Sequence, residues 1–350
     1  CQISSTPITV ATQTPTITPG GPTLTPSPTA TPTPFPTPVP VVRIDAGDKA
    51  LFYGDFDSAR QHYLSAYNDT ADKDIKAAAL WGLGRVELAD GRYAPAIEKL
   101  TTLTTEYPDS TYSARAYFNL SRFQESADAY DMYSTRIPGV LDSYAQEYRG
   151  DALVEIKNYT GAINAYTSAL NASRLSDGLT LQVKIAQARA DFGDYAGALA
   201  LYDQISNSTT SDFLKAQIDH LAGNAHLALG QSDAAYARYL HAVENYPLSI
   251  YSYLSLVKLV DANVPVDDLD RGLVDYFAGA NDVALVAFDR YIEANPTHDG
   301  TASYYRALTL REMQRNQEAI DALEAFIKSY PSHPRWTEAW EDKSFLEWAV

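Results

Sequence analysis

One short pattern recurs along most of this chain and restricts the folds open to it. A turn residue is followed five positions later by alanine, and an aromatic residue or leucine stands four positions after the alanine. The alanines of the copies are Ala59, Ala96, Ala162, Ala198, Ala235, Ala284 and Ala319, and most steps between them are 35 to 37 residues. A period of this length is typical of a supersecondary unit that is stacked in tandem.

Each copy has the features of a helical hairpin. Glycines such as Gly150 and Gly223 stand seven residues before the turn position, where a small residue lets two helices approach closely. Turns such as Gly193-Asp194-Tyr195 end one helix and orient the next. Proline follows several of the second helices, as at Pro108, and stops them.

These residues resemble the tetratricopeptide repeat, a helical hairpin of about 34 residues. The resemblance implies an all-α fold, a right-handed superhelical solenoid of about eight hairpins, with an extra helix and an unpaired terminal helix. Its concave groove is expected to bind protein or peptide partners. We expect repeats 1–6 over residues 43–248, an inserted helix in 249–263, and repeats 7–8 with the terminal helix in 264–350.

Two places depart from the regular period. The double step between Ala96 and Ala162 hides a third copy around Ala127 and Tyr130. This copy lacks a Gly-Asp-aromatic turn, and its first helix is about two turns short, so we expect a distorted hairpin. The long step from Ala235 to Ala284 is explained by one extra helix.

The last helix is rich in large apolar residues. We expect a subunit interface there, formed by Trp336, Trp340, Phe345, Leu346 and Trp348. Three explanations stay open: the natural protein continues past Val350, the helix docks on another molecule, or it is a plain cap whose tryptophans pack backwards.

The first 42 residues have a different composition from the rest. Residues 2–42 hold no charged residue, 12 threonines and 11 of the chain's 19 prolines. Proline fixes φ and removes the amide donor, so we expect an extended tether. The only cysteine, Cys1, precedes this tract as in mature bacterial lipoproteins, which predicts lipidation at Cys1 and anchoring in the outer membrane leaflet or envelope, at the cell surface. A passive spacer behind an unmodified Cys1 is the alternative.

Two kinds of glycan attachment are considered. Thr/Pro tracts are typical of O-glycosylated stalks, and the candidates are Thr14, Thr16, Thr18, Thr23, Thr25, Thr29, Thr31, Thr33 and Thr37. N-x-Ser/Thr triplets give the N-glycosylation candidates Asn68, Asn119, Asn158, Asn171 and Asn207. The second group is disfavoured because none has the acidic residue two places earlier that the bacterial oligosaccharyltransferase prefers.

Composition excludes several functions. A net charge of −17 argues against nucleic acid and anionic membrane surfaces as partners. The six histidines are scattered, no glycine-rich phosphate loop is present, and no metal site, cofactor or catalytic residue is predicted in residues 1–350.

Segment 251–300 carries a second resemblance. With Val264-Pro265-Val266, Arg271-Gly272-Leu273-Val274 and Asp289-Arg290-Tyr291, it resembles the repeat half of lipoprotein-type soluble lytic transglycosylases of the Chloroflexota. That family's catalytic motif, Glu-Ser-x-Phe, is absent, because Glu125-Ser126 is followed by Ala127-Asp128.

Two functions follow from these observations. The first is a non-catalytic scaffold for protein interaction or assembly, self-associating head to tail in a glycosylated extracellular fibre. The alternative is the repeat region of a peptidoglycan lytic transglycosylase whose catalytic domain lies outside this sequence.

Overall fold

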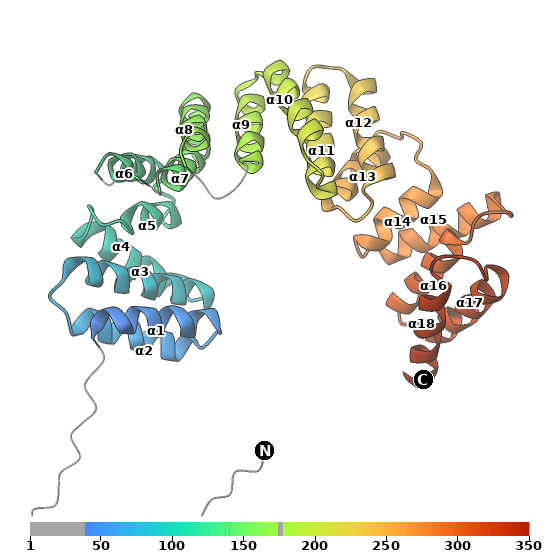
Figure 1. Cartoon of the computed structure of the whole chain (residues 1–350), viewed down its shortest axis with the longest axis horizontal. Helices are drawn as coiled ribbons and strands as arrows, with labels where there is room; N and C mark the ends of the chain where they lie inside the picture. Colours follow the sequence, from blue (N-terminus) through green and yellow to red (C-terminus); the bar gives the residue numbers. More distant parts are fainter. Residues whose placement is uncertain (1–38, 137, 140, 174–177, 350) are drawn as a thin grey trace, which may run out of the picture. The chain divides into compact units, whose positions relative to one another are not determined.

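The computed structural model describes residues 39–136, 138–139, 141–173 and 178–349, which contain eighteen α-helices and no strand (Figure 1). Sixteen helices form eight hairpins: α1–α2 (Pro40–Phe52, Phe56–Asn68), α3–α4 (Lys73–Ala89, Tyr93–Glu106), α5–α6 (Ser113–Asn119, Phe123–Arg136), α7–α8 (Asp142–Glu155, Tyr159–Asn171), α9–α10 (Leu179–Phe192, Tyr195–Ser208), α11–α12 (Asp212–Ala228, Ser232–Asn245), α14–α15 (Asp268–Phe277, Asn281–Ala294) and α16–α17 (Thr301–Glu312, Asn316–Ser329). The two remaining helices are α13 (Ile250–Asp261) and α18 (Trp336–Ala349).

The expected repeat architecture is confirmed. Each helix packs against its neighbours in the sequence, so the hairpins stack in chain order. Helix α13 is the expected extra helix, and α18 is the expected terminal one. Helix α1 begins at Pro40, three residues before the expected start of the first repeat at 43. Proline at the first helical position has no amide that needs a partner.

All eight hairpins turn in the same way. One residue takes the left-handed conformation, and the next amide donates to the carbonyl five residues earlier, as Asp55 N does to Ala50 O at 2.9 Å. Glycine serves at five of these turns: Gly54, Gly91, Gly193, Gly230 and Gly279. Ser121, Lys157 and Gln314 fill the other three. The third hairpin therefore has the common turn geometry although it lacks the glycine.

The two helices of a hairpin meet at a small residue and a ring. In α7–α8, a Cβ added to Gly150 would lie 2.3 Å from a ring carbon of Tyr166, so glycine lets the ring lie against the backbone. The Tyr166 ring is buried, and its hydroxyl donates to Asp151 Oδ1 at 2.8 Å. The same bond joins Tyr63 to Asp48 and Tyr239 to Asn224.

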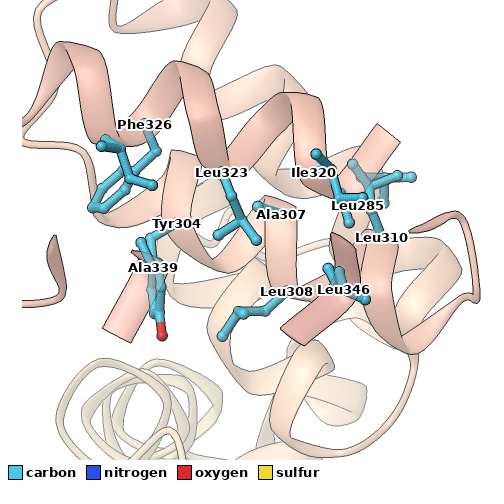
Figure 2. Packing of buried hydrophobic residues seen from close by; sticks show 12 residues of the cluster. Leu285, Tyr304, Ala307, Leu308, Leu310, Ile320, Leu323, Phe326, Ala339 and Leu346 are labelled. Carbon is cyan, nitrogen blue, oxygen red and sulfur yellow. The ribbon is translucent and has the colours of Figure 1, made fainter. Parts of the chain in front are cut away.

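The apolar core continues to the last helix. Leu285, Leu310, Ile320, Leu323 and Phe326 from α15, α16 and α17 pack together with Ala339 and Leu346 of α18 (Figure 2). One face of α18 is thus part of the core. In the helices that the structure describes, none combines the length and hydropathy needed to cross a membrane.

The third hairpin is short, as expected. Helix α5 has seven residues, whereas α7 has fourteen. Its small residue differs from the sequence-based expectation, however. Ser126, which is fully buried and donates to Ala114 O at 2.8 Å, takes the place that Ala162 has in the next hairpin, whereas Ala127 is one position further along. Both α5 and α7 end two residues before the left-handed turn residue, so the two helical turns that α5 lacks are missing at its start.

Candidate functional site

A pocket of about 230 Å³ opens beside the short helix α5. Its lining comes from helices α3, α5, α6 and α7 and consists of Trp81, Arg115, Phe118, Asn119, Tyr130, Tyr148 and Asp151. Helix α7 has two turns before Arg149 that α5 does not match, and Tyr148 lies at the end of those turns. The shortening of α5 thus leaves room that a regular repeat fills.

Position within the repeat explains why this pocket has a cationic side chain. We call the residue six before the left-handed turn residue the acceptor position, because Asp48, Asp151 and Asn224 accept the tyrosine hydroxyl there. In the third hairpin this position is Arg115. The ring that corresponds to Tyr166 is Tyr130, and it faces a guanidinium instead of a carboxylate.

Arg115 is held by aromatic rings. Its guanidinium carbon lies 4.9 Å from the centre of the Tyr148 ring. Tyr148 in turn stacks on Tyr130, with ring centres 5.6 Å apart and an angle of 27° between the planes. Tyr130 is buried, and burial raises its pKa to about 12, a rise that the Arg115 charge opposes. The Tyr130 phenol is therefore neutral at physiological pH.

Arg115 differs from every other arginine in the described part of the chain. Each of the others lies within 4.0 Å of an Asp or Glu oxygen. Arg115 has no such partner among the described residues, although the chain carries 44 acidic residues against 27 basic ones. An exposed guanidinium without a carboxylate is available to bind one.

The two carboxylates of α7 that flank Tyr148 in the sequence, Glu147 and Asp151, are paired with a lysine. Asp151 Oδ1 accepts from Lys184 Nζ at 2.7 Å in addition to the Tyr166 hydroxyl, and Glu147 lies 3.0 Å from the same ammonium group. Lys184 thus draws both carboxylates toward α9. Among the described residues Arg115 therefore has no carboxylate oxygen within 4.0 Å, although Asp151 lines the same pocket.

The predicted interface residues of α18 divide into two groups. Leu346 is buried, and Trp336 donates its indole hydrogen to Ile327 O at 3.0 Å, so both pack back onto the chain. Trp340, Phe345 and Trp348 are exposed, and Trp348 keeps 85% of its surface accessible. The backward-packing alternative therefore holds for Trp336 and Leu346, and an apolar face remains.

The predicted modification sites are reached only in part. Cys1 and the threonine candidates of the N-terminal tract lie outside the described residues. The five N-x-Ser/Thr asparagines are all exposed, at or near helix ends. Asn158 caps α8 by accepting from Gly161 N at 3.0 Å, and Asn119 donates to Arg115 O at 2.8 Å.

Metal and histidine chemistry find no support in the described residues, where no three His, Cys, Asp or Glu side chains are grouped as metal ligands. His220 is buried and its Nδ1 lies 3.1 Å from Ser255 Oγ.

The pocket residues Trp81, Arg115 and Tyr148 were not predicted from sequence. The sequence did hold one signal for this site. When the copies are aligned on their turns, Arg115 stands at the acceptor position where Asp48 and Asp151 stand in other hairpins.

Comparison with known proteins places two segments of the chain. Residues 44–111 and 301–333 match models described as tetratricopeptide repeat. Among solved structures, the chain is similar to a tetratricopeptide repeat protein from Parabacteroides merdae, at 15% identity, with 77% of this chain and 98% of that chain covered and a TM-score of 0.46.

Two further solved structures show the same kind of likeness. PilF of Pseudomonas aeruginosa is 16% identical over 63% of this chain and 97% of that chain, with a TM-score of 0.45. The apo form of RapI is 11% identical over 88% and 97%, with a TM-score of 0.47. The comparison with curated sequences gave no match. Residues 44–111 and 301–333 thus match tetratricopeptide repeats, and the described residues have the all-helical fold of stacked hairpins that such repeats form.

Proposed function

We propose that this protein is a non-catalytic scaffold that binds a short peptide segment of a protein partner in the pocket beside α5. The segment presents one carboxylate to Arg115 and one apolar side chain to the rings of the pocket. The observation that supports this proposal is the unpaired guanidinium of Arg115 in a strongly acidic chain. Tetratricopeptide repeats in general form scaffolds for protein–protein contacts.

The geometry favours a single carboxylate over a run of them. A guanidinium can bind a carboxylate through two parallel hydrogen bonds. The Tyr148 ring lies beside the cation, so the position of the guanidinium is preorganised. The net charge of −17 repels a highly acidic segment at long range. Short-range pairing at Arg115 therefore selects a ligand whose other groups are apolar and fit between Trp81, Phe118 and Tyr148.

An array of immobilised decapeptides tests this function. Each peptide carries one Glu beside one Phe or Leu, and its twin carries Gln in place of Glu. We expect binding to the Glu peptides, with Arg115→Gln reducing it at least about tenfold. Arg122→Gln, which alters a paired arginine on the same hairpin, is the matched control and should leave it unchanged. Equal binding of Glu and Gln peptides would contradict the proposal.

Self-assembly is a second candidate function, favoured by the exposed face of α18. A shift of 35 residues places Phe345 at the position of Leu310 and Trp348 at that of Met313. In hairpin α16–α17 Leu310 is buried and Met313 packs against the core, because α17 lies over α16. The exposed residues of α18 fit an amphipathic helix of a second molecule, which supports head-to-tail association.

Light scattering over a concentration series tests this association. The wild-type chain should gain mass with concentration, and Phe345→Ser/Trp348→Ser should stay monomeric. Leu254→Ser, which changes an exposed apolar residue of α13, is the control. A wild-type chain that stays monomeric at millimolar concentration would rule out this mode of assembly.

The setting of the protein is a further proposal, supported by sequence alone. Lipidation of Cys1 would anchor the scaffold at the cell surface, and O-glycosylated threonines would stiffen the tract behind it. Intact mass of the protein from its native source tests lipid, glycan and chain length together. It also tests the alternative of a lytic transglycosylase repeat region, for which no residue of this chain supplies catalysis.

A further inference from the structure

Four loops that follow the second helix of a hairpin share one construction. Tyr107, Tyr246, Asn295 and Tyr330 each end a second helix and are followed by proline. The amide of the residue three positions further on donates to the carbonyl of this Tyr or Asn. These third residues are Ser110, Ser249, His298 and His333. We call the first two the loop serines and the last two the loop histidines.

The side chain at this place accepts a backbone hydrogen bond two residues later. Ser110 Oγ accepts from Tyr112 N at 3.3 Å, and Ser249 Oγ accepts from Tyr251 N at 3.2 Å. His298 Nδ1 accepts from Gly300 N at 3.1 Å, and His333 Nδ1 accepts from Arg335 N at 3.0 Å. The loop histidines thus do with a ring nitrogen what the loop serines do with a hydroxyl.

This acceptor role fixes the tautomer of both imidazoles. A nitrogen that accepts from an amide carries no hydrogen, so the neutral ring holds its proton on Nε2. Nε2 of His298 lies 3.0 Å from Tyr330 Oη, and Nε2 of His333 lies 3.4 Å from Thr301 Oγ1. The first contact joins the loop after α15 to the end of α17, and the second joins the start of α16 to the loop after α17. A second proton would have to enter at Nδ1, against the amide hydrogen.

The charges around the two rings are mixed. His298 is flanked by Asp299 and by the rings of Tyr291 and Tyr330, and it shares a pocket of about 450 Å³ with the ion-paired Asp289 and Arg306. His333 faces Asp299, Arg335 and Glu338, and packs on Phe326. Burial lowers the pKa of His333. The negative charges of Asp299 and Glu338 oppose this shift, and the positive charge of Arg335 reinforces it.

We propose that the loop histidines make the region from α15 to α18 sensitive to pH. Protonation at Nδ1 as the pH falls removes the hydrogen bonds to Gly300 N and Arg335 N. Gly300 is the residue that precedes α16, and Arg335 precedes α18. The entry turns of both helices then loosen, while the serine-capped loops at Ser110 and Ser249 keep their bonds. Protons reach the rings from two open pockets, of about 450 and 650 Å³.

Amide hydrogen exchange of the full chain at pH 7.5 and pH 5.0 tests this inference. Rates are corrected for the intrinsic pH dependence of exchange. We expect protection of the Gly300 and Arg335 amides to fall about tenfold at pH 5.0. The Tyr112 and Tyr251 amides, which bond to the loop serines, serve as internal controls and should change less than twofold. An equal change at all four amides would overturn the inference.

A matched pair of substitutions gives a second readout. His298→Ser/His333→Ser installs the acceptor that the chain itself uses at Ser110 and Ser249. It should abolish the pH-dependent loss of protection at Gly300 and Arg335, and circular dichroism at pH 7.5 confirms that it folds. Should the double variant be misfolded, each single variant is measured at its own loop. Persistence of the pH effect in a folded serine variant would refute the role of the imidazole.

Discussion

Hairpins α5–α6 and α7–α8 are neighbours built on one plan with different results. A shift of 36 residues superimposes Ser121 on Lys157, Tyr130 on Tyr166 and Arg115 on Asp151. The turn and the ring are kept in both hairpins. In α7–α8 the ring is closed off by a carboxylate, whereas in α5–α6 the helix is seven residues shorter and a cation stands in the place of the carboxylate. The loss of two helical turns and one change of charge turn a packed contact into an open pocket.

The largest effect should come from removing the two rings in turn. Tyr166→Ala leaves a cavity in a closed core and should destabilise the protein by about 3–5 kcal/mol. Tyr130→Ala empties a site already beside a pocket, so its cost should be at least about 1 kcal/mol smaller. Urea unfolding followed by circular dichroism measures both. Equal losses would mean that the two hairpins are packed alike.

Exchanging the charges at the acceptor position comes next. Asp151→Arg removes the acceptor of Tyr166 and sets a cation beside Lys184, so a loss of about 2 kcal/mol is expected. Arg115→Asp brings a carboxylate to Tyr130 and should change stability by less than about 1 kcal/mol. The same unfolding experiment separates them, and a larger loss for Arg115→Asp than for Asp151→Arg would reverse the assignment.

Hairpin α11–α12 extends the comparison to pH. Burial lowers the pKa of His220 to about 4, and the nearby Lys258 adds to this shift. A lowered histidine pKa leaves stability unaffected above about pH 7 and reduces it as pH falls through the unfolded value of about 6.5 toward 4. We expect His220→Gln to remove about 1 kcal/mol of the loss seen between pH 7 and pH 5.

Thermal unfolding at a series of pH values measures this effect. His226→Gln makes the same substitution at a half-buried histidine of the same helix and is the matched control. An unchanged profile in His220→Gln would show that His220 does not remain neutral on folding.

The smallest effects are expected at the turns. Ser121 and Lys157 have φ near 57° and 59°, where a side chain is strained. Ser121→Gly and Lys157→Gly should each stabilise the chain by about 0.5–1 kcal/mol, because glycine adopts this conformation freely. Calorimetric melting temperatures measure the gain. A gain at one turn alone would show that the two hairpins differ in their turns as well as in their helices.

Much of the fold could be predicted from the sequence because its determinants are local. The spacing of alanine and ring, the small residue seven before the turn, and the proline after the second helix each act within a single hairpin. Turn residues other than glycine were less visible, since Ser121 and Gln314 adopt the left-handed conformation that glycine signals elsewhere. Ser126 likewise takes the alanine position because the register depends on the turn.

The site was not predicted, for a physical reason. In the sequence, Arg115 looks like any exposed arginine of a helix. It is distinguished only by having no Asp or Glu partner among the described residues. Those carboxylates belong to other hairpins: Asp48 pairs with Arg85, and Asp151 pairs with Lys184. Whether a carboxylate of a neighbouring hairpin reaches an arginine depends on the lengths of the helices, and α5 is seven residues shorter than α7.

The sequence by itself therefore determined the all-helical fold and the repeating hairpin, because hydrophobic periodicity and turn chemistry act over a few residues. Only the tertiary structure decided the surroundings of single side chains in the described part of the chain. Arg115 has no carboxylate partner there, Phe345 and Trp348 are exposed, and Nδ1 of each loop histidine accepts one backbone hydrogen bond. Two side chains on separate helices pair only when packing brings them within hydrogen-bond distance, and the sequence does not show that distance.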